Sequence, residues 1–375
     1  MNKKNLREKY TAIFLLHALG DTIGFKNLEW EFNYFNENID YRTTMEIVFD
    51  FISLGGYSNI NLKGWLVSDD TLLHMAIAEA LLEVDLNKDD KLDDDSIEKI
   101  RLIMMKKIDE MKEEEHKDII RGVGKASIAG IMKKKINIDF TGGNGAAMRT
   151  LCIGAAFHKE KDLDKLIEYS IKSSKITHKI PLGFLGGLSV AYFINLALNK
   201  EPIENWPKKL IKLVLSPKVK EYIDMDDIKM VSDYNHFISL WNKYYELRFL
   251  DGKPLYTPSN KNLVYRTKFF YDFKINYEYR FEKTSIKQEY ESIGSTGVSC
   301  VLMAYDALLD SGNNWEKLIY YSMLHVGDSD TVGAVAGGLF GALYGIDNIP
   351  VHMLKYLEKK KELEKLAEEL YDKFN

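Results

Sequence analysis

The sequence predicts a mostly α-helical protein that is not divided into separate domains. Along the 375 residues, apolar side chains recur at the three- and four-residue spacing of amphipathic helices. Convincing alternation of apolar and polar residues, which is typical of half-buried strands, is scarce. No clear linker separates two parts of the chain, and no repeat of fixed period is visible. These observations favour one helical bundle.

The composition is typical of a globular protein from a reducing compartment. Hydrophobic residues make up 46% of the chain and charged residues 29%, which argues against disorder. The net charge of −5 provides no positive field for nucleic acid or an anionic membrane, so neither is expected as a partner. The two cysteines, Cys152 and Cys300, lie in apolar surroundings and cannot build a disulfide framework. The N-terminus lacks the apolar core of a signal peptide, and no run of apolar residues is long enough to span a bilayer. We therefore expect a cytoplasmic protein.

The N-terminal part alternates between patterned and unpatterned stretches. Apolar spacing predicts a helix over residues 7–19 that ends at Gly20, followed by a short polar turn in GDTIGF. Residues 26–66 show no sustained period, and we expect a long ordered loop there. Loops of that length inside a domain tend to be functional or mobile. SDDT at 68–71 then opens a strongly patterned helix, with Ser or Asp available as its N-cap.

The rest of the chain is predicted to be mainly helical. Two glycine-rich patches, RGVGKASIAG (121–130) and TGGNGAAMRT (141–150), come first. Pro181 lies near the start of a helix, where its missing N–H group costs nothing. A short strand is possible near 269–275. The predicted helices cover residues 151–157, 163–173, 177–199, 217–223, 234–248, 301–312, 332–346 and 353–374.

Two distant segments, SDDT (68–71) and DSDT (328–331), each place paired carboxylates and hydroxyls at a helix start. The simpler interpretation is that both are N-caps, because these side chains satisfy the free N–H groups there. One cap residue per helix is enough, however, and burying more carboxylates is costly unless a cation compensates their charge. If the two helix starts converge, their oxygens form an anionic cage that suits Mg²⁺ or Mn²⁺ better than zinc. Two ions about 3.5–4 Å apart, bridged by a shared carboxylate, would match this charge. The cage would consist of Ser68, Asp69, Asp70, Asp328, Asp330 and Thr331.

Several motifs occur in order along the chain: GDxxG near the N-terminus, SDDT, GGNGAAMR, THKIPLGFLGG and GDSDT before a glycine-rich helix. Together they resemble the ADP-ribosylglycohydrolase family, from about residue 10 to residue 372. LEWEF after GDTIGF, VSDDTLLHMAIAEAL, GAAMRTLCIG and LHVGDSD are most similar to its ADP-ribosylarginine hydrolase branch. The resemblance implies an all-α fold, a compact single-domain orthogonal helical bundle over residues 1–375 with a central metal-lined cleft.

The resemblance also implies a dinuclear Mg²⁺ centre, with Mn²⁺ as a possible substitute, and a reaction. Ser68-Asp69-Asp70 would hold one ion, Asp328 and Thr331 the second, and Asp330 would be shared. The substrate would be a protein whose arginine carries ADP-ribose in α-N-glycosidic linkage. Hydrolysis would release ADP-ribose and the free side chain, and we expect the enzyme to be a monomer.

Three acidic residues are the candidates for catalysis. We expect Asp69 or Asp70 to handle the proton of the attacking water, while nearby carboxylates stabilise an oxocarbenium-like state. Glu31 is a further candidate because an acidic residue on this loop gates the cleft in relatives; the alternative is an ordinary exposed glutamate. His74 lies one helical turn after Asp70, where a hydrogen bond between the two side chains is geometrically possible.

Glycine turns supply exposed N–H groups for phosphates, and several of them match the family's phosphate and ribose contacts. His178 follows the family's Thr-His pair, although a core histidine is an equally good interpretation. Aromatic residues in 241–271 either stack on adenine or belong to the core. The predicted substrate-binding residues are Gly124, Ser127, Gly143, Asn144, Gly145, His178, Ser295 and Gly297.

One loop departs from the arginine-hydrolase pattern. That branch usually carries His-Asp after Ser-Ser-Gly, whereas here Ser295-Thr296-Gly297 is followed by Val298 and Ser299. Because the loop lies near the adenosine ribose in relatives, the departure leaves the linkage preference open. Besides hydrolysis at arginine, the alternatives are hydrolysis of a serine or O-acyl linkage, and a non-catalytic ADP-ribose-binding or structural member.

Overall fold

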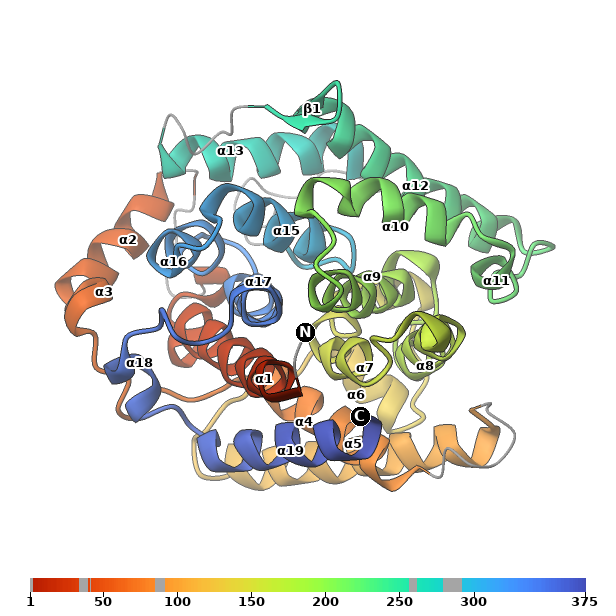
Figure 1. The fold of residues 1–375 in the computed structure, drawn as a ribbon, viewed down its shortest axis with the longest axis horizontal. Helices are drawn as coiled ribbons and strands as arrows, with labels where there is room; N and C mark the ends of the chain where they lie inside the picture. Colours follow the sequence, from red (N-terminus) through yellow and green to blue (C-terminus); the bar gives the residue numbers. More distant parts are fainter. Residues whose placement is uncertain (1–2, 34–39, 41, 85–91, 256–261, 279–291) are drawn as a thin grey trace.

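A computed structural model describes residues 3–33, 40, 42–84, 92–255, 262–278 and 292–375, and most of these residues lie in helices (Figure 1). The predicted all-α fold is confirmed. The described strands form one short antiparallel hairpin, β1 (Phe249–Leu250) with β2 (Lys253–Pro254). The longer helices are α1 (Lys3–Phe25), α2 (Thr43–Ser53), α4 (Asp69–Glu83), α5 (Asp94–Glu115), α8 (Leu163–Lys175), α9 (Pro181–Leu198), α10 (Trp206–Val214), α12 (Ile228–Arg248), α13 (Leu263–Phe273), α15 (Ser299–Ser311), α16 (Trp315–Ser322), α17 (Ser329–Tyr344) and α19 (Lys360–Phe374).

Shorter helical segments connect them. They are η1 (Lys26–Leu28), η2 (Glu31–Asn33), α3 (Gly56–Asn59), α6 (Lys125–Ile131), η3 (Ile138–Gly142), η4 (Ala147–Arg149), α7 (Leu151–Ala156), η5 (Glu160–Asp162), η6 (Ile203–Asn205), α11 (Pro217–Lys220), η8 (Lys274–Glu278) and α18 (Val351–Lys355).

Helices α1 and α17 lie side by side in the middle of the bundle, and glycines let their backbones touch (Figure 1). A Cβ atom on Gly20 would stand 2.0 Å from the carbonyl oxygen of Gly333, and one on Gly337 would stand 2.0 Å from that of Leu16. The prediction that Gly20 ends the first helix is therefore wrong: α1 continues to Phe25, and the glycine serves close packing. The GDTIGF segment is the last part of this helix and not a turn.

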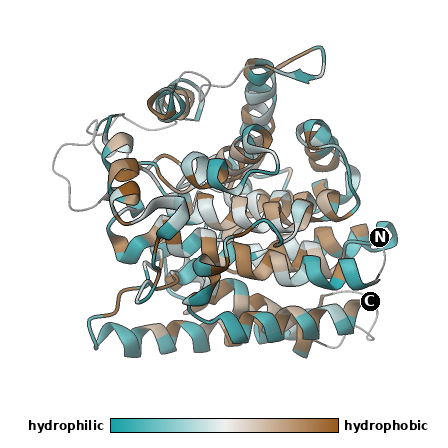
Figure 2. Ribbon diagram, turned by 60° about the vertical axis from the view of Figure 1, so that its left-hand side comes forward, coloured by the Kyte–Doolittle hydropathy of each residue, from teal (hydrophilic) through white to brown (hydrophobic). Residues whose placement is uncertain are grey.

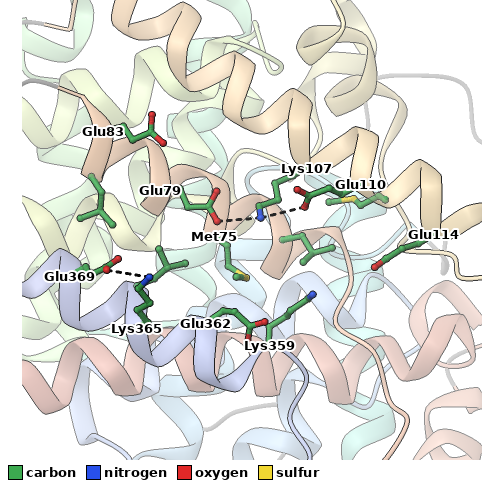
Figure 3. Close-up of a pocket in the computed structure, with 14 residues that line it drawn as sticks. Met75, Glu79, Glu83, Lys107, Glu110, Glu114, Lys359, Glu362, Lys365 and Glu369 are labelled. Atoms are coloured by element: carbon green, nitrogen blue, oxygen red, sulfur yellow. Dashed lines mark ion pairs between the residues drawn. The ribbon is translucent and has the colours of Figure 1, made fainter.

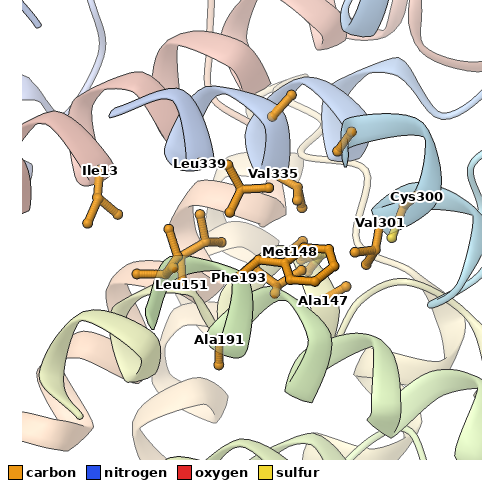
Figure 4. Close-up of a cluster of buried hydrophobic side chains, with 14 of the residues drawn as sticks. Ile13, Ala147, Met148, Leu151, Ala191, Phe193, Cys300, Val301, Val335 and Leu339 are labelled. Carbon is orange, nitrogen blue, oxygen red and sulfur yellow. The ribbon is translucent and has the colours of Figure 1, made fainter. Parts of the chain in front are cut away.

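The apolar core forms around this central pair. Figure 4 shows side chains from α1, α7, α9, α15 and α17 meeting in one cluster, among them Ile13, Leu151, Phe193, Val301 and Val335. All of these side chains are buried. In Figure 2 hydrophobic residues run through the inner helices, whereas the helical layer at the lower edge carries many hydrophilic residues on its outer side. The bundle therefore hides apolar faces that each amphipathic helix could not bury alone.

Helix α9 is the one described helix that is long and apolar enough to cross a membrane by length and composition alone. However, 89% of its apolar window is buried inside the bundle, as in the core helix of many globular proteins. Cys152 and Cys300 are both free and buried, so no disulfide joins them.

Three expectations about local structure are wrong. Residues 26–66 are not one loop, because Thr44, Ile47, Val48 and Phe51 form a buried helical face on α2 that the β-branched composition obscured. The region of the possible strand near 269–275 is helical in α13 and η8, since its aromatic residues pack at helical spacing.

The third expectation concerns the C-terminal helix, which is interrupted. Helix α18 ends at Lys355, and α19 begins after Lys359, whose φ of 58° lies in the left-handed region. The break directs Glu358 into the protein, where it binds Arg121.

Candidate active site

The N-termini of α4 and α17 converge at the floor of a cleft, as the paired acidic segments predicted. The cleft has a volume of about 890 Å³, and Asp69, Asp70, Asp328 and Asp330 all line it. Ligand oxygens of Glu31, Asp328 and Asp330 lie within 4.8 Å of one another, and all three residues are buried. The structure therefore brings together carboxylates from three separate parts of the chain.

At the start of α4, a single residue does the capping. Ser68 Oγ accepts a hydrogen bond from the Asp70 backbone N–H at 3.1 Å. The carboxylates of Asp69 and Asp70 are therefore not needed for the cap and are free to face the cleft. At the start of α17, Asp328 occupies the N-cap position without making a capping bond; its Oδ2 accepts from Asn144 Nδ2 at 2.9 Å instead. N-capping alone thus does not explain these acidic residues.

Asp21 on α1 is a site residue that sequence reasoning missed. Its carboxylate accepts hydrogen bonds from the backbone N–H groups of Ser68, at 3.0 and 3.1 Å, and Thr71, at 3.2 Å, and also from the Thr71 hydroxyl. Burial, then the nearby charge of Asp330, raises the pKa of Asp21 to about 7. The signal in the sequence was the GDxxG motif itself, whose aspartate follows a glycine that allows contact with α17.

Glu31 reaches the cluster from an unusual piece of backbone. Phe32 and residues 26–28 have positive φ angles, which are costly for residues other than glycine. The Phe32 N–H group donates to the carbonyl of Gly327 at 3.0 Å, which fastens this segment beside the start of α17. Glu31 is only 5% exposed, so the alternative of an ordinary surface glutamate is wrong.

Each carboxyl of the cluster is harder to ionise than in water. Desolvation by burial is the largest cause, and the charges of neighbouring carboxylates add to it. Arg149 lowers the pKa of Asp69, but the net effect on that carboxyl is still a rise. The affected groups are Glu31, Asp69, Asp70, Asp328 and Asp330.

The donor set fits a hard divalent cation. Within the described part of the chain, Asp70 Oδ2 and Glu31 Oε2 are buried without any hydrogen-bond partner. Buried oxygens of this kind normally have a donor or an ion as partner. Oxygen-only ligands with this much negative charge are typical of Mg²⁺ and Mn²⁺ sites.

The walls of the cleft contain most of the predicted substrate-binding residues. Gly124, Ser127, Gly143, Asn144, Gly145, His178 and Ser295 line it. A Cβ atom on Gly124 would meet nothing within 4 Å, so this residue faces open space. On Gly145 it would lie 2.8 Å from Ser127 Oγ and 2.9 Å from His178 Cε1, so the glycine lets the two side chains approach. His178 Nδ1 lies 2.7 Å from the Thr177 hydroxyl, and burial lowers the pKa of this imidazole to about 3, which keeps it neutral.

Gly297 does not line the cleft. A Cβ atom on Gly186 of α9 would stand 2.3 Å from the Gly297 carbonyl oxygen, so this residue serves helix packing. Ser299, where the arginine-hydrolase pattern differs, exchanges hydrogen bonds with Thr296: Ser299 N donates to Thr296 Oγ1 at 3.0 Å, and Thr296 N donates to Ser299 Oγ at 3.2 Å. Among the described residues of 241–271, none lines the cleft, and Trp241 and Tyr244 belong to the core.

The hydrogen bond that the sequence allowed between His74 and Asp70 is not formed. The His74 ring stacks on Phe14 with centroids 4.7 Å apart and lies 4.4 Å from the His17 ring. Within the described residues, neither ring nitrogen of His74 has a hydrogen-bond partner. Burial and the neighbouring His17 lower its pKa, so it is a neutral core side chain.

A second cavity, of about 410 Å³, lies on the surface between α4, α5 and α19 (Figure 3). Its lysines neutralise much of its acidic rim. Lys107 lies 3.2 Å from Glu79 and 3.4 Å from Glu110, and Lys365 lies 3.6 Å from Glu369. Because most charges there are compensated and solvated, the acidic cleft is the better candidate for catalysis.

Comparisons with known proteins point to one family. The profile of the ADP-ribosylglycohydrolase family matches residues 2–375. ADP-ribosylhydrolase ARH1 of Dictyostelium discoideum is 34% identical over 397 residues, which cover 99% of this chain and 94% of that protein. The putative ADP-ribosyl glycohydrolase L444 of Acanthamoeba polyphaga mimivirus is 32% identical over 339 residues, or 89% of this chain and 63% of that protein. Human ADP-ribosylhydrolase ARH3 is 27% identical over 283 residues, or 70% of each. A solved structure described as an ADP-ribosylglycohydrolase-related protein complex has a TM-score of 0.57 at 18% identity and covers 98% of this chain and 99% of its own, which shows similarity of fold.

Proposed function

Because the chain belongs to the ADP-ribosylglycohydrolase family, we propose that it removes ADP-ribose from modified arginine side chains of proteins in a Mg²⁺-dependent reaction. Hydrolysis of ADP-ribosyl groups follows from the family. The finer assignment to arginine is supported by the motifs LEWEF, VSDDTLLHMAIAEAL and GAAMRTLCIG, which are most similar to the arginine branch.

One observation carries the proposal: buried, uncompensated carboxylates gather at the floor of a cleft large enough for a nucleotide-sized ligand. Removal of so many carboxylates from water is unfavourable unless a bound cation restores the balance of charge. Perturbed acidic groups in a cleft are typical of functional sites.

The protein ligands of two Mg²⁺ ions would come from both helix starts. Bound ions would orient the ribose hydroxyls and polarise the water that attacks the glycosidic carbon. Asp330 would be shared, because it lies in the first turn of α17 near Asp328 and its charge also raises the pKa of Asp69 and Asp70. Glu31 is close enough to join them. The candidate ligands are Ser68, Asp69, Asp70, Asp328, Asp330 and Thr331.

The protein's own side chains would divide the remaining tasks. Asp69 or Asp70 would accept the proton of the attacking water, since both carboxylates face the cleft. Glu31 is the alternative base, because its carboxylate lies close to that of Asp69. A Cβ atom on Gly122 would lie 3.5 Å from Glu31 Oε2 and 3.8 Å from Asp69 Oδ1. Neutral His178 would hydrogen-bond the sugar or diphosphate, and Lys125 on the cleft wall would attract the negative charge of the diphosphate.

The proposal extends to partners and location. The partner would be an ADP-ribosylated protein, and the product free ADP-ribose. A cytoplasmic monomer is proposed as well, supported by the two buried free cysteines and by a net charge that disfavours nucleic acid and anionic membranes.

The test compares two substrates under two conditions. Purified protein is incubated with a protein ADP-ribosylated on arginine and with one modified on serine, each with Mg²⁺ or with EDTA. We expect release of ADP-ribose from arginine only, and its loss in EDTA. Asp330→Ala should reduce the rate by at least about a hundredfold, because a direct ligand matters at least as much as the groups that orient it. Asp109→Asn is the matched control, since Asp109 is an exposed partner of Lys112 on α5.

Each other outcome points to one alternative. Release from serine and not from arginine would assign the enzyme to another linkage, which the Val298-Ser299 departure leaves open. Binding of ADP-ribose without turnover of either substrate would identify a non-catalytic member of the family.

A further inference from the structure

Two side chains outside the cleft, Arg121 and Glu358, clamp the segment that leads into α4. We infer that they are positioning residues for the Ser68-Asp69-Asp70 ligand group and thereby set the affinity for divalent cations. The inference rests on the proposed Mg²⁺-dependent function, because the clamp can set a cation affinity only if the ligand group binds a cation.

The clamp holds both backbone groups of Val67. Glu358 Oε2 accepts a hydrogen bond from the Val67 N–H at 2.8 Å, and the Arg121 guanidinium donates to the Val67 carbonyl at 2.8 Å. Arg121 and Glu358 also bind each other through two hydrogen bonds of 2.8 and 3.0 Å. Finally, the Arg121 carbonyl accepts from the Asp69 N–H at 2.8 Å.

These bonds act directly on the ligand group. Val67 precedes Ser68 and has no helix or strand of its own to fix it. Asp69, bound by the Arg121 carbonyl, is the first residue of α4. On the other side, Gly122 follows Arg121 and lies against the carboxylates of Glu31 and Asp69. One arginine therefore positions the two chain segments that border the acidic cluster.

The charge arrangement is specific to an arginine. Arg121 is only 1% exposed, and its Nε donates to Glu114 at 2.7 Å. Glu114 lies at one end of the second cavity, the one shown in Figure 3. A planar guanidinium can serve Glu358, Glu114 and a carbonyl together, whereas the ammonium of lysine cannot match this fork geometry.

The position of Glu358 depends on the interruption between α18 and α19. A continuous C-terminal helix would keep residue 358 in helical geometry on the surface of the bundle. The break, with Lys359 in the left-handed region, turns the carboxylate of Glu358 toward the backbone N–H group of Val67, 291 positions earlier in the chain. The last part of the chain thus contributes to the site without lining the cleft.

The test measures metal binding apart from turnover. Arg121→Lys and Glu358→Gln are compared with the native protein by calorimetric titration with Mn²⁺, and hydrolysis is measured as a function of Mg²⁺ concentration. We expect the Kd for Mn²⁺ to rise by about tenfold or more in both variants, the size of effect seen when groups that orient metal ligands are changed. At saturating Mg²⁺, kcat should return close to the native value, because the ligands themselves are intact.

Arg248→Lys is the matched control for stability. Arg248 is equally buried and pairs with Asp306 at 2.6 Å and Asp310 at 3.0 Å, both on α15. This control should lower the melting temperature and leave the Kd for Mn²⁺ unchanged. Glu358→Gln keeps the shape of the side chain and decides the question if Arg121→Lys does not fold.

The two hypotheses fail in different ways. If the native protein binds no divalent cation, the proposed metal dependence is wrong, and the inference falls with it. If the native protein binds Mn²⁺ and both variants bind it equally well, the clamp is merely structural while the proposed function stands.

Discussion

At the scale of single residues, the cleft floor keeps several carboxyls in surroundings that favour their neutral form. Glu31, Asp69, Asp70 and Asp330 all have raised pKa values because they are desolvated and lie near one another. Charged carboxylates in such an arrangement lower the stability of the metal-free protein, and a bound cation would stabilise them. Function and stability therefore make opposite demands on the same side chains.

This conflict predicts how stability depends on pH without metal. The folded-state pKa of Asp21 is about 7, against about 3.9 for an unfolded aspartate, so the folded protein binds more protons between these values. The stabilisation from these groups is complete below about pH 3.9 and is lost as pH rises through the folded-state values. In EDTA, the free energy of unfolding should thus fall as pH rises from about 4 to about 7. Urea unfolding at a series of pH values measures it.

Two controls accompany this measurement. Saturating Mg²⁺ should flatten the pH dependence, because bound ions hold the carboxylates in their charged form. Asp330→Asn should flatten it in EDTA, since one interacting charge is gone. A free energy of unfolding that increases with pH in EDTA would contradict the interpretation.

Residue chemistry was the part of the site that the sequence predicted best. The acidic segments at 68–71 and 328–331 were recognisable because they hold more carboxylates than two N-caps require. Asp21 was missed because a lone aspartate before a threonine looks like a turn residue. Its importance appears only when α1 continues past Gly20 and places its carboxylate beneath the start of α4.

At the scale of elements, close contact between α1 and α17 decides where the carboxylates of α17 stand. The hydroxyl of Ser329 donates to the Gly24 carbonyl at 2.8 Å, which places the first turn of α17 directly against α1. Asp328 and Asp330 flank this contact. The small residues of α17 therefore bring its N-terminus to the cleft floor, at a depth that bulkier side chains would prevent.

A pair of neighbouring substitutions tests this contact. Gly337→Ala would place a methyl group 2.0 Å from the Leu16 carbonyl oxygen, which is part of a helix backbone and cannot move easily. Gly338→Ala meets Leu151 Cδ2 at 2.1 Å, the flexible end of a side chain. We expect Gly337→Ala to lower the free energy of unfolding by about 1–3 kcal/mol. Gly338→Ala should change the free energy of unfolding by less than about 1 kcal/mol, since the higher helix preference of alanine offsets the cost of repacking Leu151.

Chemical denaturation of the two variants provides the comparison. Equal losses would mean that the backbone contact between α1 and α17 has no special importance. The activity of Gly337→Ala at saturating Mg²⁺ is informative as well, because a shift of α17 displaces Asp328 and Asp330 together.

The sequence predicted helices well where apolar spacing was long and regular, as in α9 and α17. The prediction failed where β-branched or aromatic residues, which are typical of strands, obscured the helical spacing of apolar side chains. In α2, Thr44, Ile47 and Val48 are β-branched, which disfavours a helix locally, but burial of one face outweighs this preference. In α13, a run of aromatic residues looked like a strand although it packs at helical spacing.

At the scale of the whole molecule, the acidic cluster at the cleft floor joins segments that share no local structure. The start of α4, the start of α17 and the segment around Glu31 meet at one place. Chemistry allowed the first two to be paired from sequence, because both carry the same acidic pattern. The contribution of Glu358 could not be predicted, since it depends on a break in a helix whose apolar period continues on both sides.

A centre of this kind predicts strong stabilisation by its ion. Because folding assembles the ligands, a divalent cation at about 100 times its Kd should add about 2.7 kcal/mol for each site. Melting curves in Mg²⁺, Mn²⁺ and EDTA should therefore differ by several degrees. Asp330→Ala should show a much smaller difference between Mg²⁺ and EDTA, and equal melting temperatures for the native protein in all three would contradict the prediction.

The pairing of α1 with α17 also has a consequence for biosynthesis. Ser329 and Gly24, which join the two helices, are 305 positions apart, and Asn375 at the end of the chain donates to the Tyr10 hydroxyl. At a translation rate of about 5–20 residues per second, α1 waits roughly 15–60 s on the ribosome before its partner emerges. During that time the face of α1 that packs against α17 has no native cover, so we expect this nascent chain to depend on chaperones until α17 is made.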